Sequence, residues 1–416
     1  MKVEIINIGD ELLIGQVINT NAAWMAEQLD LSGFPVRLVT VVRDCHEQIL
    51  ETLQEAEKRS EVVLISGGIG PTNDDITKKT LCEFFQARLV FDEEAFRDIE
   101  IFFALRGLHV TELNRQQADI PEGCISLPNK IGTARGMWFE KQGGHNKNSI
   151  FVSMPGVPFE MKEMMINEVI PRLQKKFHPP FLYHKTALTQ GIGESFLAAQ
   201  IEAWENKLPE NIKLAYLPQP GIVRLRLSGS GNNEQRVRQQ VNTALKELEA
   251  QISDYIFGYD EDTLEEIVGK LLLEKGKTLA TAESCTGGYI AHLITSVPGC
   301  SGYYRGSLVA YSNEIKESLL FVSPNILKKE GAVSEETTME MAVAAQTQFD
   351  ADYVIATSGI AGPEGGTVEK PVGTTWIALA TPDEVFARKY LFGDSRERNI
   401  RRTALQALNM LRKSLI

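Results

Sequence analysis

The chain contains 416 residues, of which 43 % are hydrophobic and 24 % charged, and its formal net charge is −12. This composition is that of a globular protein of about two to four domains. The negative charge disfavours direct binding to nucleic-acid phosphates. No apolar run approaches the ~18 residues of a membrane helix, and the first residues become acidic too soon for a signal peptide. We therefore expect a cytoplasmic protein with no membrane partner.

The cysteine usage points to the same compartment. The chain has five cysteines, and no two of them form a CxxC pair. This pattern fits reduced cytosolic thiols better than a disulfide framework or a zinc site. The five residues are Cys45, Cys82, Cys124, Cys285 and Cys300.

The N-terminal part of the chain alternates strand and helix signals. Four apolar runs predict buried strands at 3–9, 36–42, 61–66 and 150–153. Ile49, Leu53 and Ala56 recur at helical spacing and predict an amphipathic helix over 46–58. Repeated strand–helix–strand units favour a parallel sheet that is covered on both faces. We therefore predict an α/β domain over residues 1–172.

A glycine-rich loop, residues 66–77, follows the third of these strands. Its glycines let backbone amides approach an anionic group closely. Either Asp74 or Asp75 can cap the helix that comes next. The loop is therefore a candidate anion site.

A smaller unit follows a predicted linker at 175–182, where two prolines adjoin. The expected elements are a strand at 183–190, a helix near 194–206, two strands around a turn at 218–221 and a helix at roughly 232–252. This order predicts a small α+β domain over 180–255. It resembles nucleic-acid-binding or ferredoxin-like modules, but no GxxG loop has basic flanks. We therefore favour a spacer domain.

The third domain is expected over 260–416, where Thr263 and Glu266 predict a capping box at the start of a helix. A strand at 277–282 runs directly into Glu283-Ser284-Cys285-Thr286-Gly287-Gly288, and a helix follows. The amides at a helix start are unpaired, so they can bind an oxyanion or a phosphate. A serine there would lie next to such a site.

Two further segments of this domain follow predicted strands. Residues 311–316 end one strand and start a helix, and residues 358–366 follow the strand 353–356. Parallel strands bring such loops to one edge of a sheet, so both segments are expected near Ser284. No histidine lies in them, which disfavours a Ser-His-Asp triad. A lysine can act as the base if its surroundings lower its pKa.

This last domain resembles the CinA C-terminal family. The resemblance is carried, in the family's order, by AESCTGG (282–288), YSNEIK (311–316), GAVSEET (331–337), SGIAGPEGG (358–366) and EKPVGTTW (369–376). Standalone members are nicotinamide-mononucleotide deamidases, so the resemblance implies hydrolysis of that nucleotide to nicotinate mononucleotide and ammonia, without a cofactor.

The resemblance also implies roles for individual residues. Ser284 matches the nucleophile, Lys316 its proton acceptor and Tyr311 a hydrogen-bonding partner of that pair. Cys285 is the rival nucleophile, which the family pattern disfavours. The implied substrate-binding residues are Thr286, Gly287, Gly288, Ser358, Gly359 and Gly362.

The phosphate of such a substrate suits an arginine, because a guanidinium binds phosphate through two parallel hydrogen bonds. Residues 393–401 resemble the family's GDR segment with one extra residue. Arg396 is the better match and Arg398 the alternative.

The N-terminal domain resembles the molybdopterin-binding domain in its SGG loop, in Gly9-Asp10-Glu11-Leu12 and in Met154-Pro155-Gly156. Ile69 stands where those enzymes have a threonine, and Asp74 where they commonly have a basic residue. A second carboxylate favours a divalent-metal bridge to a pyrophosphate over direct binding of a pterin phosphate. Some CinA-type domains of this kind hydrolyse ADP-ribose, so the resemblance implies metal-dependent cleavage of the ADP-ribose diphosphate.

The residues expected at that phosphate site are Gly67, Gly68, Gly70, Thr72, Thr77 and Asn19. The candidate metal ligands are Asp74 and Asp75, followed by Asp10 and Glu11. We therefore expect a bifunctional enzyme of pyridine-nucleotide recycling, acting as a homodimer. Two alternatives stay open: a competence or DNA-damage accessory protein that binds partners, and a molybdenum-cofactor-binding protein.

Overall fold

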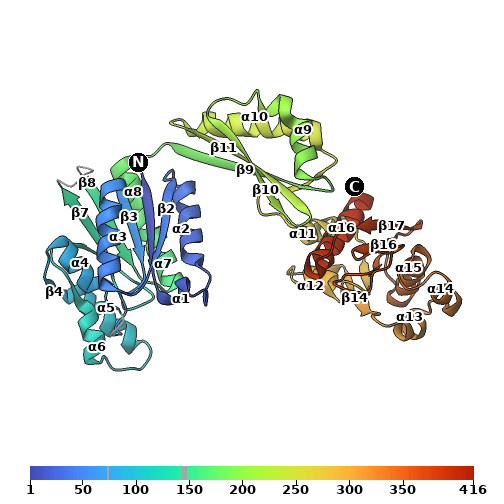
Figure 1. Ribbon diagram of the computed structural model, residues 1–416, viewed down its shortest axis with the longest axis horizontal. Helices are drawn as coiled ribbons and strands as arrows, with labels where there is room; N and C mark the ends of the chain where they lie inside the picture. Colours follow the sequence, from blue (N-terminus) through green and yellow to red (C-terminus); the bar gives the residue numbers. More distant parts are fainter. Residues whose placement is uncertain (73–74, 143–147) are drawn as a thin grey trace. The chain divides into compact units, whose positions relative to one another are not determined.

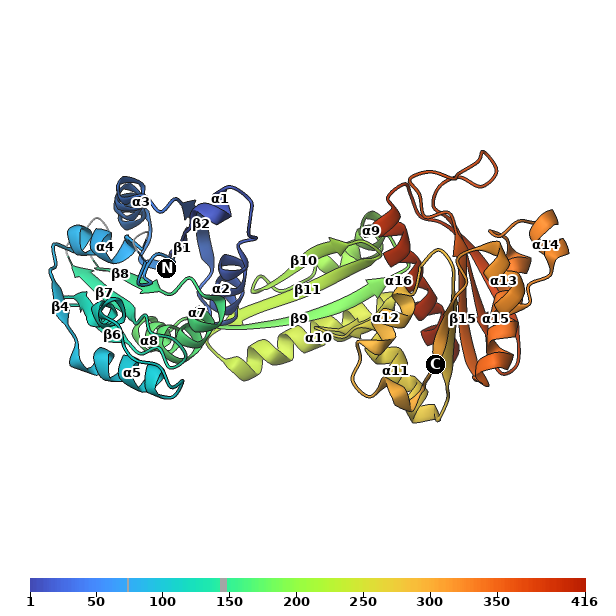
Figure 2. The same ribbon diagram turned by 90° about the horizontal axis from the view of Figure 1, so that it is seen from below.

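The computed structural model describes residues 1–72, 75–142 and 148–416. Its contacts divide the chain into two compact units, Met1–Tyr183 with Ser230–Val237, and His184–Gly229 with Arg238–Ile416 (Figures 1 and 2). None of the helices in the described ranges combines the length and the apolar surface that a membrane crossing requires.

The first unit contains a six-stranded sheet with helices on both faces (Figure 1). Its elements are β1 (Val3–Ile8), α1 (Asp10–Leu13), α2 (Thr20–Leu31), β2 (Val36–Val42), α3 (His46–Arg59), β3 (Val62–Ser66), α4 (Thr77–Phe85), β4 (Leu89–Phe91), α5 (Glu93–Ala104), α6 (Glu112–Arg115), β5 (Asp119–Pro121), β6 (Ile125–Leu127), β7 (Gly136–Gln142), β8 (Asn148–Met154), α7 (Pro158–Met164) and α8 (Ile170–Phe177). The strand order is β2-β1-β3-β8-β7-β6, and β4 and β5 form a separate pair.

The central strands β1 and β3 of this sheet are buried on both sides. Val3 and Ile5 of β1 pack with Met25 of α2 on one face, and Ile6 packs with Ile49 of α3 on the other. Successive side chains of a strand point to opposite faces, so covering both faces requires an uninterrupted apolar run. Strands β2, β1, β3 and β8 are parallel, which confirms the predicted α/β class of this domain.

The second unit begins with a four-stranded sheet of order β10-β11-β9-β12. Its elements are β9 (Phe181–Gln190), α9 (Glu194–Glu205), β10 (Ile212–Gln219), β11 (Ile222–Gly231), α10 (Glu234–Ile252) and β12 (Ile256–Tyr259). The predicted linker over 175–182 is too long, because α8 continues to Phe177 and β9 begins at Phe181. Proline ends a helix for lack of an N–H group but allows a strand to begin directly afterwards.

The rest of this unit contains a mixed five-stranded sheet of order β14-β13-β15-β16-β17. Its elements are α11 (Leu264–Lys275), β13 (Leu279–Glu283), α12 (Tyr289–Thr295), β14 (Tyr304–Val309), α13 (Asn313–Leu320), α14 (Pro324–Lys329), α15 (Glu335–Phe349), β15 (Tyr353–Gly359), β16 (Thr374–Ala380), β17 (Val385–Leu391) and α16 (Arg396–Leu415). Thr263 and Glu266 form the predicted capping box of α11. Strand β13 lies between β14 and β15 and is parallel to both.

Alternate residues of β13 face different helices. Leu279 packs with α11, α12 and α16 on one side, whereas Ala280 and Ala282 pack with Met341 of α15 on the other. Three parallel strands therefore end at one covered edge, and their following loops meet there.

Candidate active site at the edge of the C-terminal sheet

Ser284 directly follows β13 at this edge. Its amide donates to the carbonyl oxygen of Thr357 in β15 at 3.0 Å, so the serine stays attached to the neighbouring strand. Its side chain is 7 % exposed. The hydroxyl therefore lies in a poorly hydrated place with a fixed backbone.

Lys316, in the first turns of α13, brings its amine to this serine. The Nζ atom lies 3.0 Å from Ser284 Oγ, 2.8 Å from the carbonyl oxygen of Ala310 and 3.2 Å from that of Tyr311. Lys316 is 1 % exposed, and its burial lowers the pKa of the amine below the ordinary value of 10.5. The structure therefore brings together the predicted nucleophile and the predicted base.

The three acceptors around Lys316 can satisfy either protonation state of its amine. An ammonium group offers three N–H donors, whereas the neutral amine offers two and a lone pair. The carbonyls of Ala310 and Tyr311 can only accept, and they match those two donors. Nζ also donates to Ser284 Oγ, and once the amine is neutral its lone pair is left for the proton of this hydroxyl. Lysine can thus act as a general base without any histidine.

Cys285 lies next to Ser284 in the chain but is unsuited to be the nucleophile. Its burial raises the pKa of the thiol to about 12, whereas a reactive cysteine must form the thiolate. The Oγ1 atoms of Thr286 and Thr357 lie 2.8 Å apart, so the Thr286 hydroxyl is engaged with β15. The loop after β13 therefore offers Ser284 as its reactive side chain.

Tyr311 contacts the pair differently from the expectation. Its backbone carbonyl accepts from Lys316, whereas its hydroxyl accepts from the Arg396 guanidinium at 2.9 Å. The side chain is 60 % exposed. Tyr311 is thus a hydrogen-bonding partner of Lys316 through its main chain, and its ring extends towards the arginine.

Arg396 lies at the start of α16. It is one of the two arginines that the sequence offered as phosphate ligands. Besides Tyr311, its guanidinium donates to the carbonyl oxygen of Gly362 at 3.0 Å. Gly362 has φ +90°, and a Cβ there would lie 2.6 Å from Val372 Cγ1, so only glycine fits this turn. The exposed Arg398 has no such link to the site within the described residues. The structure therefore favours Arg396 as the cation near Ser284 and Lys316.

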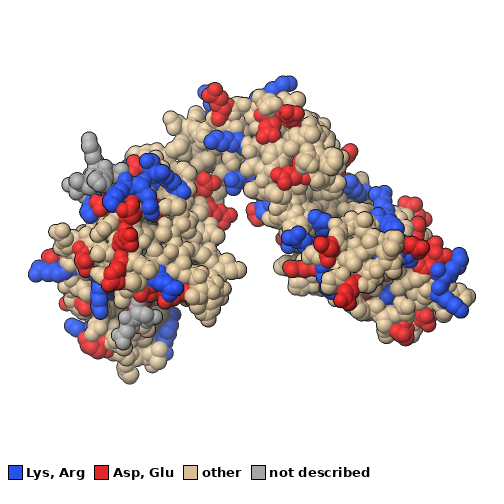
Figure 3. All heavy atoms as spheres, viewed as in Figure 1, with Lys and Arg blue, Asp and Glu red and all other residues tan. Residues whose placement is uncertain are grey.

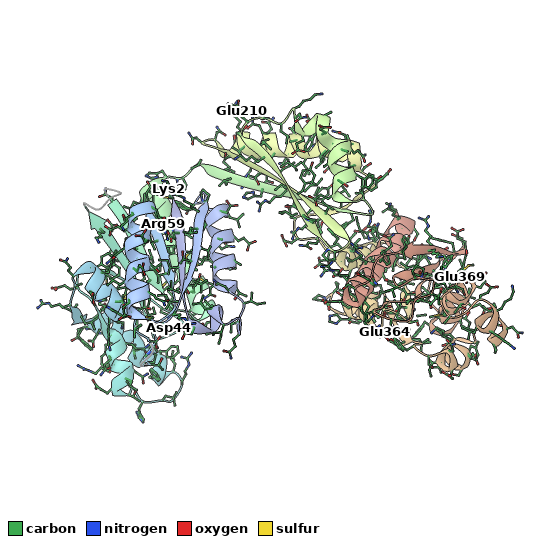
Figure 4. All side chains as sticks on the ribbon, viewed as in Figure 1. Lys2, Asp44, Arg59, Glu210, Glu364 and Glu369 are labelled. Atoms are coloured by element: carbon green, nitrogen blue, oxygen red, sulfur yellow. The ribbon has the colours of Figure 1, made fainter. Side chains whose placement is uncertain are left out.

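Asn399, which the sequence did not single out, supports this arginine. It is 2 % exposed, and its Nδ2 donates to the carbonyls of Ala361 at 2.9 Å and Gly393 at 2.8 Å. These bonds connect the start of the loop between β15 and β16, which includes Glu364 and Glu369 (Figure 4), to the loop before α16. A buried asparagine three positions after Arg396 was the available signal.

Glu283, also missed, occupies the start of α12. Its carboxylate accepts from the amides of Gly288 at 3.0 Å, Ile290 at 3.1 Å and Ala291 at 2.8 Å. These three amides are therefore not unpaired, contrary to the expectation for this helix start. The Gly287 amide is also engaged, since it donates to the Ser284 carbonyl at 3.1 Å.

The remaining amides of this loop are still available. Those of Cys285 and Thr286 donate to no protein acceptor in the described part of the chain. They directly follow Ser284, the candidate nucleophile, next to which an oxyanion would form. These two amides replace those of Gly287 and Gly288 as candidate oxyanion donors.

Ser358 and Gly359 lie in β15 beside this loop. The Ser358 hydroxyl is 1 % exposed and donates to the carbonyl oxygen of Ala332 at 2.6 Å. A Cβ at Gly359 would lie 2.7 Å from Thr375 Oγ1, so glycine allows β16 to approach. Both residues shape the wall of the site, and neither offers a free functional group.

In the N-terminal domain, the glycine loop follows β3 as predicted. Gly67 and Gly68 have φ +117° and +66°, which favour glycine, and a Cβ on Gly68 would lie 2.1 Å from Thr77 Oγ1. Thr77 is fully buried, and its hydroxyl has no hydrogen-bond partner among the described residues. An orphaned buried hydroxyl beside a glycine turn fits an anion-binding loop.

Other predicted residues of this loop bind one another. Asp75 Oδ2 accepts from the Thr72 amide at 2.8 Å and from its hydroxyl at 2.5 Å. A Cβ on Gly70 would lie 2.6 Å from the same carboxylate oxygen. Asp75 thus closes the turn at Thr72, which leaves one of its oxygens for other contacts.

The remaining candidates in this domain lie close to neighbouring protein groups. Asn19 caps α2 by accepting from the Ala22 amide at 3.0 Å. The Asp10 amide donates to Asp44 at 3.1 Å (Figure 4), and the Asp10 carboxylate lies 3.6 Å from Arg43. If Gly9 carried a Cβ atom, that atom would lie 2.4 Å from Glu11 Oε1, so the Glu11 carboxylate lies against this glycine.

The expected metal site is not assembled by these residues. Asp74 lies outside the described residues. Among the residues that the structure does describe, no three His, Cys, Asp or Glu side chains gather in a way that could hold a metal ion. We derive no chemical step through a metal for this domain.

The charged side chains are mixed over the surface. On the face shown in Figure 3, basic and acidic residues of the described chain are interspersed. This agrees with the net charge of −12, which offers no general attraction for a nucleic-acid backbone.

Three family models match successive parts of the chain. They are described as a probable molybdopterin binding domain (residues 4–175), the damage-inducible protein CinA KH domain (184–258) and the CinA C-terminal domain (261–415). The matches to the first and last agree with the resemblances seen in the sequence.

Similar proteins cover the whole chain. A CinA-like protein of Cytophaga hutchinsonii is 47 % identical over 412 residues, covering 99 % of this chain and 97 % of the relative. A putative competence-damage inducible protein of Halothermothrix orenii is 40 % identical, covering 96 % of this chain and 95 % of the relative. A crystal structure of a competence/damage inducible protein from Agrobacterium tumefaciens is 34 % identical, covering 37 % of this chain and 96 % of its own, with a TM-score of 0.35.

Proposed function

Because the chain belongs to the CinA family, we propose that its C-terminal domain hydrolyses the carboxamide of nicotinamide mononucleotide to nicotinate mononucleotide and ammonia. The observation that carries this proposal is the contact of 3.0 Å between the buried Lys316 amine and the Ser284 hydroxyl. A serine beside an uncharged amine can attack an amide carbonyl.

In the first step, Ser284 Oγ forms a bond to the carboxamide carbon while its proton passes to Lys316 Nζ. The carbonyl oxygen becomes an oxyanion, and the free amides of Cys285 and Thr286 are the donors closest to it along the chain. The C–N bond then breaks, and the departing nitrogen takes the proton from Lys316 and leaves as ammonia.

The second step hydrolyses the acyl-enzyme and regenerates the free serine hydroxyl. Water gives a proton to Lys316 and attacks the acyl carbon. The bond from this carbon to Ser284 Oγ breaks, and the proton on Lys316 returns to the serine oxygen. Nicotinate mononucleotide leaves with a carboxylate in place of the carboxamide. One lysine therefore serves both steps as base and then as acid.

Arg396 is the proposed phosphate ligand of this substrate. Tyr311 connects the two ends of the site, since its carbonyl accepts from Lys316 and its hydroxyl accepts from Arg396. A substrate with an amide at one end and a phosphate at the other suits this arrangement. The guanidinium is exposed and can form bidentate bonds to phosphate.

The proposal is tested by incubating the purified full chain with nicotinamide mononucleotide and measuring ammonia and nicotinate mononucleotide. We expect the two products in equal amounts. Nicotinamide riboside, which lacks the phosphate, and free nicotinamide serve as controls and should react more slowly. A chain that releases no ammonia from the nucleotide would favour the binding role suggested by the competence-related names of its relatives.

For the N-terminal domain we propose a second activity, the cleavage of ADP-ribose by water at its diphosphate to AMP and ribose 5-phosphate. The orphaned Thr77 hydroxyl beside Gly67 and Gly68 supports an anion-binding role for this loop.

A matched pair of glycine variants tests this activity. Gly68→Ala should abolish AMP formation, because a Cβ would collide with Thr77 and the positive φ disfavours alanine. Gly123→Ala carries the same backbone strain at φ +82° but meets no atom within 4 Å, so it should retain activity. Absence of AMP in wild type with every divalent metal tried would refute the proposal.

A further inference from the structure

The carboxylate of Glu283 is completely buried, and protein donors surround it. Besides the amides of Gly288, Ile290 and Ala291, it accepts from the Thr281 hydroxyl at 3.3 Å. A buried carboxylate is costly unless such bonds compensate for lost water, and bonds to a charged acceptor are the stronger kind. Glu283 therefore ties the end of β13 firmly to the first turn of α12.

The nucleophile lies inside the segment that Glu283 closes. Ser284 is the next residue after Glu283, and the chain returns to the Glu283 carboxylate at Gly288. Both ends of this short loop are thus fixed to one side chain. The direction of the Ser284 hydroxyl, which must meet Lys316 at 3.0 Å, depends on the conformation of this loop.

The buried carboxylate also affects where a substrate anion can bind. Glu283 uses the α12 amides that would otherwise attract a phosphate, and it adds a negative charge there. Arg396 is the cation linked to the opposite end of the site through Tyr311. The phosphate is therefore directed to Arg396 and away from the nucleophile.

We infer that Glu283 is a positioning residue, which holds the Ser284 loop so that the serine hydroxyl lies in line with the Lys316 amine. It touches neither substrate nor reacting atoms, because it is fully buried. This inference rests on the proposed amide hydrolysis. A role in helix capping alone would affect stability without affecting the chemistry at Ser284.

The test compares Glu283→Gln with Glu266→Gln in the full chain. The glutamine at 283 presents an NH2 group where a carboxylate oxygen now accepts from the fixed Ala291 amide, so the loop must shift. Glu266 is the matched control, since it caps α11 through Thr263 at 3.2 Å and lies in no part of the site.

Two readouts are measured for each variant. The first is ammonia release from nicotinamide mononucleotide, as kcat and KM. The second is the rate at which a fluorophosphonate modifies Ser284, followed by mass spectrometry, which needs no knowledge of the substrate. Glu283→Gln should lower kcat and the labelling rate by about 100-fold with KM little changed, because small misplacements of reacting groups have effects of this size.

Glu266→Gln should lower the melting temperature and leave both rates unchanged. If Glu283→Gln does not fold, Thr281→Val removes one donor to the same carboxylate and should lower the labelling rate to a smaller extent. Wild-type rates in a folded Glu283→Gln, or no labelling of Ser284 in wild type, would overturn the inference. Labelling that depends on Glu283 in a chain that releases no ammonia would instead retain the inference and refute the proposed substrate.

Discussion

The amine of Lys316 and the hydroxyl of Ser284 lie 3.0 Å apart, although the residues are separated by 32 positions in the chain. The contact arises because β13 and β14 are parallel neighbours whose following loops meet at one edge of the sheet. One loop contributes the serine, and the helix after the other contributes the lysine. Burial then keeps water from this pair and lowers the pKa of the amine.

Replacing the serine should abolish activity, whereas replacing the neighbouring cysteine should not. Ser284→Ala is expected to lower kcat for ammonia release by about 10⁴-fold or more, as for other serine nucleophiles. Cys285→Ala should keep most of it, because a thiol with a pKa of about 12 forms no thiolate at neutral pH. Steady-state rates on the two purified variants check this, and a dead Cys285→Ala that is still folded would contradict our assignment.

The activity should depend on pH through the Lys316 amine. The base must be uncharged, so kcat/KM should fall as pH decreases through the pKa of Lys316. Burial lowers that pKa, which places this acid limb below the ordinary 10.5. Lys316→Arg should be inactive at every pH tested, because a guanidinium does not lose its proton. A pH–rate profile whose only limb lay near 10.5 would contradict an activated lysine.

Replacement of the two candidate arginines should affect KM to different extents. Arg396→Ala should raise KM for nicotinamide mononucleotide by roughly 10- to 100-fold, the equivalent of losing charge-assisted hydrogen bonds of about 1.5–3 kcal/mol. Arg398→Ala is its matched control and should change KM little. With nicotinamide riboside, which has no phosphate, both variants should behave like wild type. An equal effect of Arg396→Ala on both substrates would argue against phosphate binding.

Removing the hydroxyl of Tyr311 distinguishes its two contacts. Tyr311→Phe loses the hydrogen bond to Arg396 and keeps the carbonyl that accepts from Lys316. We expect kcat to stay unchanged and KM to rise by roughly five-fold, the effect of one hydrogen bond of about 1 kcal/mol. A large fall in kcat would instead place the hydroxyl in the proton transfer.

Much of the architecture could be predicted from periodicity. The strand at 61–66 and the helix at 46–58 agree closely with β3 (Val62–Ser66) and α3 (His46–Arg59), because strands buried on both faces need continuous apolar runs. The antiparallel strand β12 was missed, since its residues Ile256–Tyr259 are too few to show a period.

The residues of the candidate site could be predicted from the sequence where their side chains supply the chemistry. Ser284 and Lys316 stand in segments of distinctive composition, and both have the expected contact. The role of Glu283 was not visible, because its partners are backbone amides that any residue type can offer. That Tyr311 contacts Lys316 through its main chain was hidden for a related reason, since a backbone carbonyl leaves no mark in the sequence.

The proposed mechanism requires Ser284 to become covalently bound to the substrate during turnover. The direct measurement is mass spectrometry of the wild-type chain, quenched with acid while it consumes nicotinamide mononucleotide and then digested. We predict an ester on the peptide that contains Ser284, with the mass of the nucleotide less ammonia, and none in Lys316→Arg. The same mass on Cys285, or ammonia release with Ser284 replaced by alanine, would contradict it.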